Sequence, residues 1–203
     1  MRIPLLLCLS VLASLTLRAQ DPLPRAEAVR FAALLNLDLE KLKDTPIPTD
    51  ADVKRPFGIR ADKRGGLLVP EAKLSIQTLA KAAKEIVPVG QLWLAGVVPQ
   101  RGSEAVPKSE LKLVTVEHEG REVTLPLCVL GVRRTEAGEL ELLVFGKGRD
   151  PLLKLPLKKL ASGPREAAAP LEFTAERAAE GAKITLLVVG AFEATFEVTA
   201  PAE

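Results

Sequence analysis

After Pro88 the chain is a succession of short apolar segments, and glycine or proline separates most of them from the next. Segments of this length are typical of β-strands, and glycine- and proline-containing joints are typical of turns. A parallel α/β arrangement needs helices between successive strands, and little of this part of the chain is left for helices. The fold is therefore expected to be mainly β, as an antiparallel sandwich or a partly open barrel.

The clearest strand pattern lies near the end of the sequence. From residue 192 to residue 199 apolar side chains alternate with Glu and Thr, which predicts one buried and one solvated face. Gly190-Ala191 before it predicts a two-residue hairpin, and Glu119-Gly120 predicts another between strands 110–119 and 122–132. Pro156 within the strand candidate 152–160 indicates an edge strand, because proline cannot donate to a ladder.

Two helices are expected in the first part of the chain, with short strand candidates at residues 57–60 and 67–69 between them. Residues 25–44 should form a helical N-terminal appendage, since apolar residues recur near every 3.6 positions until the TPIPTD stretch. This appendage is expected to pack on the chain's own core or to serve as a docking arm for a partner. A short helix near 75–85 should begin at Ser75 as its N-cap and be closed by Pro88. Residues 56–200 then form the β-rich domain, with a candidate division at 162–170.

The first nineteen residues resemble a secretory signal peptide. Arg2 precedes a mainly apolar stretch over residues 3–17, and the small residue Ala19 suits a cleavage site. The apolar stretch is shorter than the roughly 20 residues that cross a bilayer as a helix. A buried helix or an uncleaved anchor is the alternative. The signal interpretation predicts an extracytoplasmic protein, periplasmic or secreted, without a transmembrane segment after cleavage.

Removal of this leader changes the composition. The whole chain has 28 Lys and Arg against 26 Asp and Glu, and Arg2 and Arg18 lie in the leader, so the remainder is neutral. A neutral chain gives no general attraction for nucleic acid, and no nucleic-acid partner is expected. Cys128 is then the single cysteine, so it forms no internal disulfide, and its apolar surroundings predict a buried thiol.

Residue types that carry catalysis are scarce. His118 is the only histidine, so it would have to serve any zinc site, serine triad or cysteine dyad with Cys128. A metal site would use His118 with Glu117, Glu119 or both, but neighbouring strand residues point to opposite faces, so Glu117 and His118 do not easily converge, and an exposed turn histidine is expected. The serines of the mature chain are Ser75, Ser103, Ser109 and Ser162, and none of them stands in a nucleophile elbow. No catalytic, cofactor-binding or metal-ligating residue is assigned, and no cofactor is expected.

Basic side chains are densest at Lys54, Arg55, Arg60, Lys63 and Arg64. This basic cluster could contact an anionic polymer or a lipid head group, although interleaved aspartates weaken its field and a solvated loop face is the simpler interpretation. The sequence favours a non-catalytic β-domain that binds a protein or an envelope polymer, or has a structural role. The alternative is a carboxylate-dependent hydrolase, which would need a pocket with two carboxylates about 5–10 Å apart.

Overall fold

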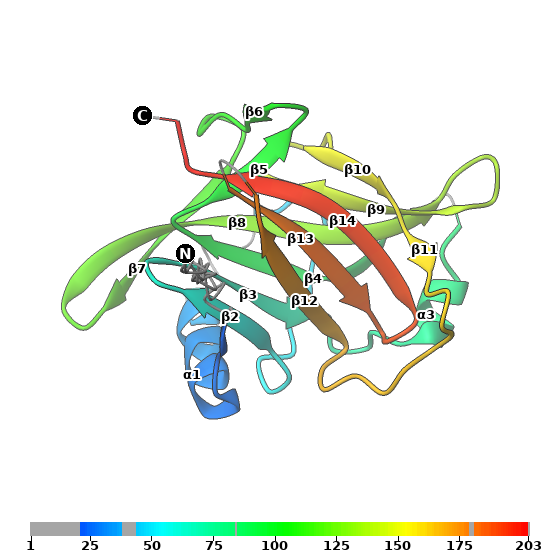
Figure 1. Cartoon of the computed structure of the whole chain (residues 1–203), viewed down its shortest axis with the longest axis horizontal. Helices are drawn as coiled ribbons and strands as arrows, with labels where there is room; N and C mark the ends of the chain where they lie inside the picture. Colours follow the sequence, from blue (N-terminus) through cyan, green and yellow to red (C-terminus); the bar gives the residue numbers. More distant parts are fainter. Residues whose placement is uncertain (1–20, 38–43, 84, 179–180, 203) are drawn as a thin grey trace, which may run out of the picture.

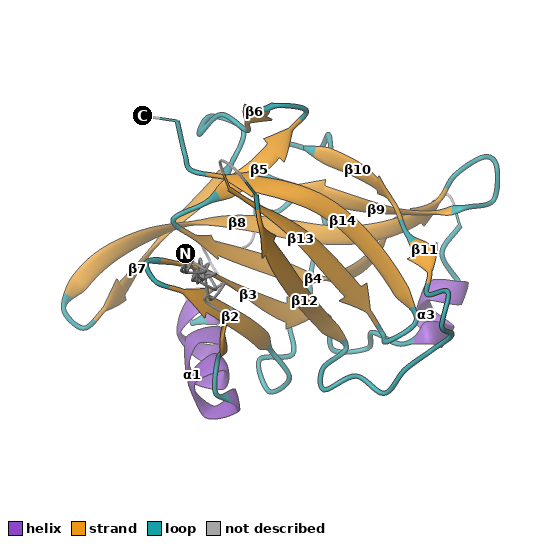
Figure 2. Ribbon diagram, in the orientation of Figure 1, coloured by secondary structure: helices purple, strands orange, loops and turns teal. Residues whose placement is uncertain are grey.

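The computed structural model describes residues 21–37, 44–83, 85–178 and 181–202, so the leader over residues 1–19 lies outside the described residues. Two antiparallel sheets pack face to face (Figure 1 and Figure 2). The first sheet has the order β1-β2-β3-β4-β8-β9-β10, with β7 paired to β8, and the second has the order β12-β13-β14-β5-β6, with β11 paired to β14.

The bounds of the strands follow from their backbone pairing. The first sheet contains β1 (Asp21–Pro22), β2 (Phe57–Ala61), β3 (Arg64–Pro70), β4 (Val87–Ala95), β7 (Lys112–His118), β8 (Arg121–Arg134), β9 (Leu140–Phe145) and β10 (Leu153–Pro156). The second contains β5 (Val98–Arg101), β6 (Glu104–Ala105), β11 (Lys158–Lys159), β12 (Leu171–Arg177), β13 (Gly181–Val188) and β14 (Phe192–Thr199). The expectation of an antiparallel β fold is confirmed, and of the two forms considered it is the sandwich.

The core between the sheets is built from both of them. Leu68 and Leu92 of the first sheet belong to the same buried cluster as Phe173 and Phe196 of the second. Alternation along β14 is as expected: Phe192, Ala194, Phe196 and Val198 are buried, and the residues between them are exposed or half-buried. Burial of this face, at roughly 25 cal/mol for each Å² of apolar surface, holds the sheets together.

The expected strand over 152–160 is divided between the sheets. β10 pairs with β9 in the first sheet, whereas β11 pairs with β14 in the second. Leu157 lies between them and is buried in the common core, so the chain crosses from one sheet to the other there. The prediction of one continuous strand was wrong. Pro156 does lie on an edge strand, because β10 ends the order of the first sheet.

The two hairpin predictions have different outcomes. Glu119 and Gly120 join β7 to β8 with φ of 53° and 72°, which confirms a two-residue turn with both central residues left-handed. The joint between β13 and β14 has three residues, 189–191, rather than the predicted two, because Val188 pairs with Phe192. Its left-handed residues are Val189 and Gly190, with φ of 47° and 65°, and the N–H of Ala191 donates to the carbonyl of Val188.

Helix α1 (Arg25–Asn36) lies on the outer face of the first sheet, away from the second sheet (Figure 1). Ala28, Ala32 and Leu35 are buried there in a second apolar cluster with Leu67 and Trp93 of the sheet. The expected appendage thus packs on the chain's own structure over its described part, and residues 38–43 lie outside the described residues. Small alanine side chains let the helix approach the sheet closely.

The second helix is shorter than expected. α3 (Ile76–Ala80) begins at Ser75, whose Oγ accepts from the backbone N–H of Thr78 at 3.2 Å, so the predicted cap is confirmed. It ends near Lys81 rather than residue 85. Pro88 does not close the helix. It lies inside β4, where the register against β8 shifts between Pro88 and Gly90.

The loop over residues 161–170 is held to β12 by a buried carboxylate. Glu172 is 9% exposed and accepts from the backbone N–H groups of Ala168 and Ala169, the latter at 3.2 Å. Its other oxygen pairs with Arg165 at 3.2 Å. Among the described residues no helix is long and apolar enough to span a bilayer.

Candidate functional site

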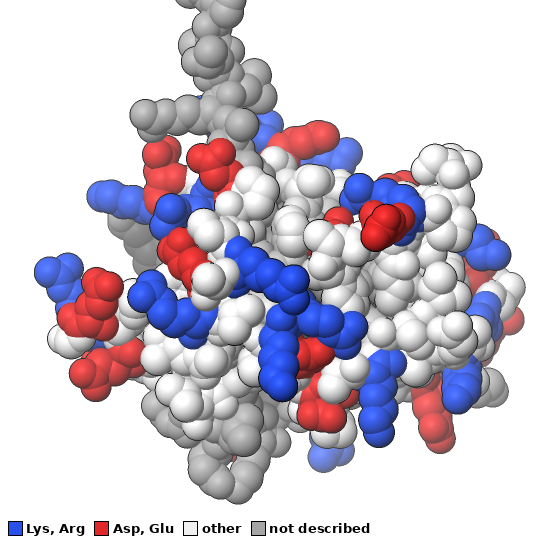
Figure 3. All heavy atoms as spheres, turned by 90° about the horizontal axis from the view of Figure 1, so that it is seen from below, with Lys and Arg blue, Asp and Glu red and all other residues white. Residues whose placement is uncertain are grey.

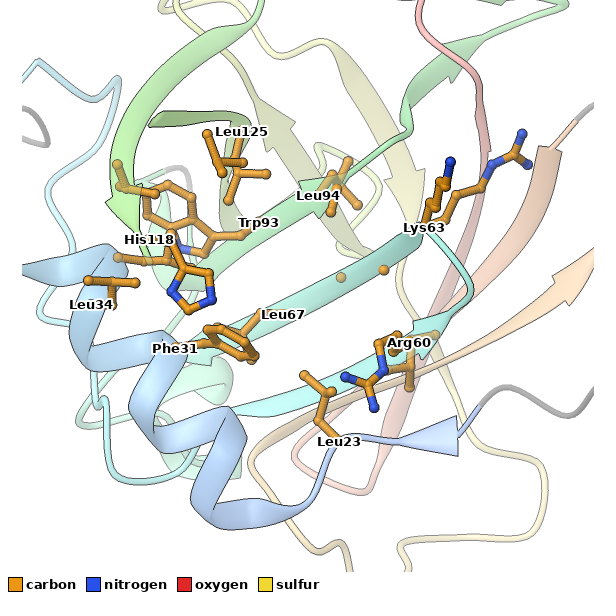
Figure 4. A pocket seen from close by; sticks show the side chains of 18 of the residues that line it. Leu23, Phe31, Leu34, Arg60, Lys63, Leu67, Trp93, Leu94, His118 and Leu125 are labelled. Atoms are coloured by element: carbon orange, nitrogen blue, oxygen red, sulfur yellow. The ribbon is translucent and has the colours of Figure 1, made fainter. Parts of the chain in front are cut away.

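An apolar pocket of about 290 Å³ lies between α1, the β3–β4 face of the first sheet and the β7–β8 hairpin (Figure 4). This volume is near the lower end of the roughly 300–1,000 Å³ of small-molecule sites. We call it the helix pocket. Its lining includes Leu67 and Trp93 from the sheet, Phe31 and Leu34 from α1, and Leu125 from the hairpin.

The hairpin wall exists because β8 is longer than its neighbour β4. On one edge β8 pairs with β7 up to Leu127 and then with β9. On its other edge it pairs with β4, which meets it from Val87 to Trp93 and then turns away at Gly96 toward β5. The β7–β8 hairpin therefore projects beyond the sheet (Figure 1), and apolar Val116, Val123 and Leu125 contribute to the pocket lining.

The polar edge of the pocket's tryptophan is already satisfied. Trp93 is 2% exposed, and its Nε1–H donates to Gln91 Oε1 at 3.1 Å. Gln91 is buried as well, and its Nε2 donates to Thr49 Oγ1 at 3.0 Å. Because these buried polar groups use one another, the indole offers an incoming ligand mainly apolar surface.

His118 lies at one end of the helix pocket rather than at an exposed turn. Its side chain is 34% exposed, and its ring meets Phe31 of α1 edge to face at 5.5 Å between centroids. Nε2 lies 3.8 Å from Glu119 Oε1, too far for a hydrogen bond. Within the described residues no three His, Cys, Asp or Glu side chains are grouped so as to hold a metal ion.

The serines show no nucleophilic arrangement. Ser75 caps α3, and Ser103, Ser109 and Ser162 are exposed. None of these four lines either of the two pockets described in this section. Cys128 is fully buried between the sheets, on the face of β8 that points away from His118, so the two do not form a dyad.

Burial also controls the chemistry of Cys128. Desolvation raises the pKa of its thiol from 9.0 to about 12. At pH 8 the native thiol should therefore resist a disulfide reagent that labels the urea-unfolded chain completely, as followed by absorbance of the released thiolate.

The raised pKa also makes stability depend on pH. The unfolded thiol ionises near 9 and the folded one near 12, so the free energy of unfolding should fall as pH rises between these values. Cys128→Ala should remove that part of the decline; rapid labelling of the native protein would contradict the buried position.

Carboxylates are not paired in either pocket that the structure describes. Among the described residues, Asp62 is the single carboxylate lining the helix pocket. A wider depression of about 700 Å³ lies beside α3, β10 and β11, and Glu139 is the one carboxylate of the described chain that lines it. Burial raises the pKa of Glu71, which accepts from the backbone N–H of Asp50 at 2.9 Å, but Glu71 lines neither pocket.

The basic cluster divides into two parts in the structure. Arg55 points to its own loop, where Nε pairs with Asp52 at 2.6 Å and Nη2 donates to the carbonyl of Ala72 at 3.1 Å. Arg60, Lys63 and Arg64 instead line the helix pocket. Figure 3 shows basic and acidic side chains interleaved over one face of the molecule, so that face is not uniformly basic.

Sequence reasoning identified the basic cluster but not the pocket. One signal was present: residues 87–95 contain a single polar residue, Gln91, and show no alternation of apolar and polar side chains, which is typical of a strand covered on both faces. The second sheet covers one face of the first sheet, and α1 covers part of the other face.

No family model matches the chain, and no curated protein or solved structure is significantly similar to it.

Proposed function

We propose that the chain is an exported, non-catalytic β-sandwich protein that binds an apolar group of an envelope partner in the helix pocket. The observation that carries this proposal is the pocket itself. It is an apolar hollow open to solvent, and it lies beside Trp93, whose indole N–H is already hydrogen-bonded to Gln91. The leader pattern at residues 1–19 supports a periplasmic or secreted location.

Three features favour binding over catalysis. The described residues place one carboxylate, Asp62, in the lining of the helix pocket, whereas glycoside hydrolysis uses two. Cys128 is buried with a raised pKa, which opposes a thiolate nucleophile. His118 packs against Phe31 and lies beside no serine among the pocket-lining residues. What remains at the site is shape and apolar surface, which serve binding.

The test uses the exported protein and the neutral fluorescent probe N-phenylnaphthylamine. Trp93 is the only tryptophan of the chain and lines the pocket, so energy transfer from it to the probe reports occupancy. We expect saturable binding of one probe per chain. Val123→Phe and, separately, Ala95→Phe should weaken it by about tenfold or more, because a phenyl ring takes up the apolar surface that the probe would cover.

Leu113→Phe is the matched control. Leu113 and Val123 lie on opposite faces of the β7–β8 hairpin and are similarly exposed, at 43% and 39%. Equal binding by all four proteins, or no binding at all, would overturn the pocket as the site. Turnover of a generic ester or glycoside by the exported protein, abolished in Val123→Phe, would replace the proposal with the hydrolase alternative.

A further inference from the structure

Within the described part of the chain, the Asp, Lys and Arg residues that line the helix pocket all come from residues 60–64, at one end of it. In Figure 4, Arg60 and Lys63 lie at one end, and Phe31 and His118 lie at the other. Arg60 is the residue before the end of β2 at Ala61, Lys63 is in the turn, and Arg64 begins β3. Arg64 pairs with Ala61 and so starts from the other face of the sheet than Arg60, but all three cations flank this one turn and line the pocket.

These cations exceed their acidic neighbours. Arg60 Nη1 lies 3.3 Å from Glu27 Oε1 of α1, and Asp62 stands in the same turn. No ion pair of Lys63 or Arg64 is found among the described residues. Three cations and two carboxylates leave an excess of one positive charge at the mouth, which complements a single negative charge on a ligand.

Small residues leave the way open from this charged mouth to the apolar floor. Arg60, Gly65 and Ala95 are paired across β2, β3 and β4 and therefore share one face of the sheet. On the same face the next row is Leu67 and Trp93. A chain of methylene groups can thus pass over Gly65 and Ala95 and contact Leu67 and Trp93, with its head group beside Arg60 and Lys63.

We propose that the helix pocket binds a single-chain amphiphile with one anionic head group, of the fatty carboxylate class. This inference rests on the proposed binding function and adds the chemistry of the ligand. An extended peptide is less well matched, because the tryptophan of the floor has no free donor: its indole N–H is occupied by Gln91. The head group would lie beside exposed cations, where it keeps part of its hydration.

The experiment compares three ligands with the same twelve-carbon chain and different head groups. Dodecanoate, dodecanol and dodecyltrimethylammonium are titrated below their micelle concentrations, with Trp93 emission and calorimetry as readouts. We expect dodecanoate to bind about fivefold more tightly than dodecanol and more tightly still than the ammonium compound, as for partly exposed charge contacts. Added salt should reduce this preference, because it screens the exposed cations.

Charge-neutral variants test the role of the mouth. The double variant Lys63→Gln, Arg64→Gln should reduce the preference for dodecanoate over dodecanol to about twofold or less, while dodecanol binding stays unchanged. The matched control Lys158→Gln, Lys159→Gln removes two exposed cations of β11, which line the other pocket, and should leave the preference intact.

Several outcomes would overturn the inference while leaving the proposed function in place. These are equal binding of the three ligands, a preference for the ammonium compound, or displacement of dodecanoate by a leucine-terminated peptide at lower concentration. Co-flotation with phosphatidylglycerol vesicles without binding of monomeric dodecanoate would assign the cations to a membrane surface instead. Failure of the neutral probe as well as all three amphiphiles would count against the pocket itself.

Discussion

Replacing Trp93 with Ala should lower the free energy of unfolding by about 3–5 kcal/mol, as for other buried tryptophans. Trp93 is among the largest fully buried side chains described and stands in the middle of the first sheet, where it pairs with Leu67 of β3 and Leu127 of β8. Its loss would leave a cavity beneath α1 and would also leave Gln91 Oε1 without its buried donor. Urea unfolding followed by circular dichroism measures the change, since the variant has no tryptophan.

Trp93→Phe separates the contribution of the buried ring from that of the hydrogen bond to Gln91. Phenylalanine retains most of the apolar volume but cannot donate to Gln91, so the expected loss is about 1–3 kcal/mol, the cost of a buried acceptor left unsatisfied together with imperfect filling. A loss below 1 kcal/mol for Trp93→Ala would show that α1 does not pack on this face of the sheet. The same result would remove the floor of the helix pocket and the basis of the proposed function.

The parts of this fold that could be predicted carry a local signal. The two faces of β14 follow from strict alternation, the turn at Glu119-Gly120 from two residues that tolerate positive φ, and the start of α3 from a serine cap. Each signal lies within a few residues and reflects one periodicity or one backbone conformation. Even so, the turn before β14 begins one residue earlier than predicted, because Val189 adopts a left-handed conformation that β-branched residues rarely take.

The helix pocket could not be predicted because no local signal describes it. It unites α1, the β2–β3 turn and the β7–β8 hairpin, which are distant along the chain. The basic cluster shows the difficulty. Arg55 and Arg60 are five residues apart, yet one is paired within its loop and the other stands at the pocket mouth. Their separation depends on the pairing of β2 with β3, which sequence spacing alone does not reveal.

Gly90→Ala should also lower the free energy of unfolding by about 3–5 kcal/mol, the range expected when backbone strain and overpacking act together. Gly90 has a φ of 150° and lies where β4 changes register against β8. A Cβ at this position would meet the backbone carbonyl oxygen of Val69 and would lie 2.8 Å from Leu171 Cδ1. Neither neighbour can easily move, because Val69 belongs to the adjacent strand and Leu171 is buried in the core.

Gly102→Ala is the control that isolates the packing contribution. Gly102 also has a positive φ, of 65°, but a Cβ there meets nothing within 4 Å. Its replacement should cost only the left-handed backbone penalty of about 1–2 kcal/mol. Urea unfolding monitored by Trp93 emission gives both values. Equal losses for the two variants would mean that β4 adjusts freely at its register shift. A larger loss at Gly90 would establish that the close approach of β3 and β12 fixes the backbone at this register shift. The shift is what lets Pro88 lie within a central strand.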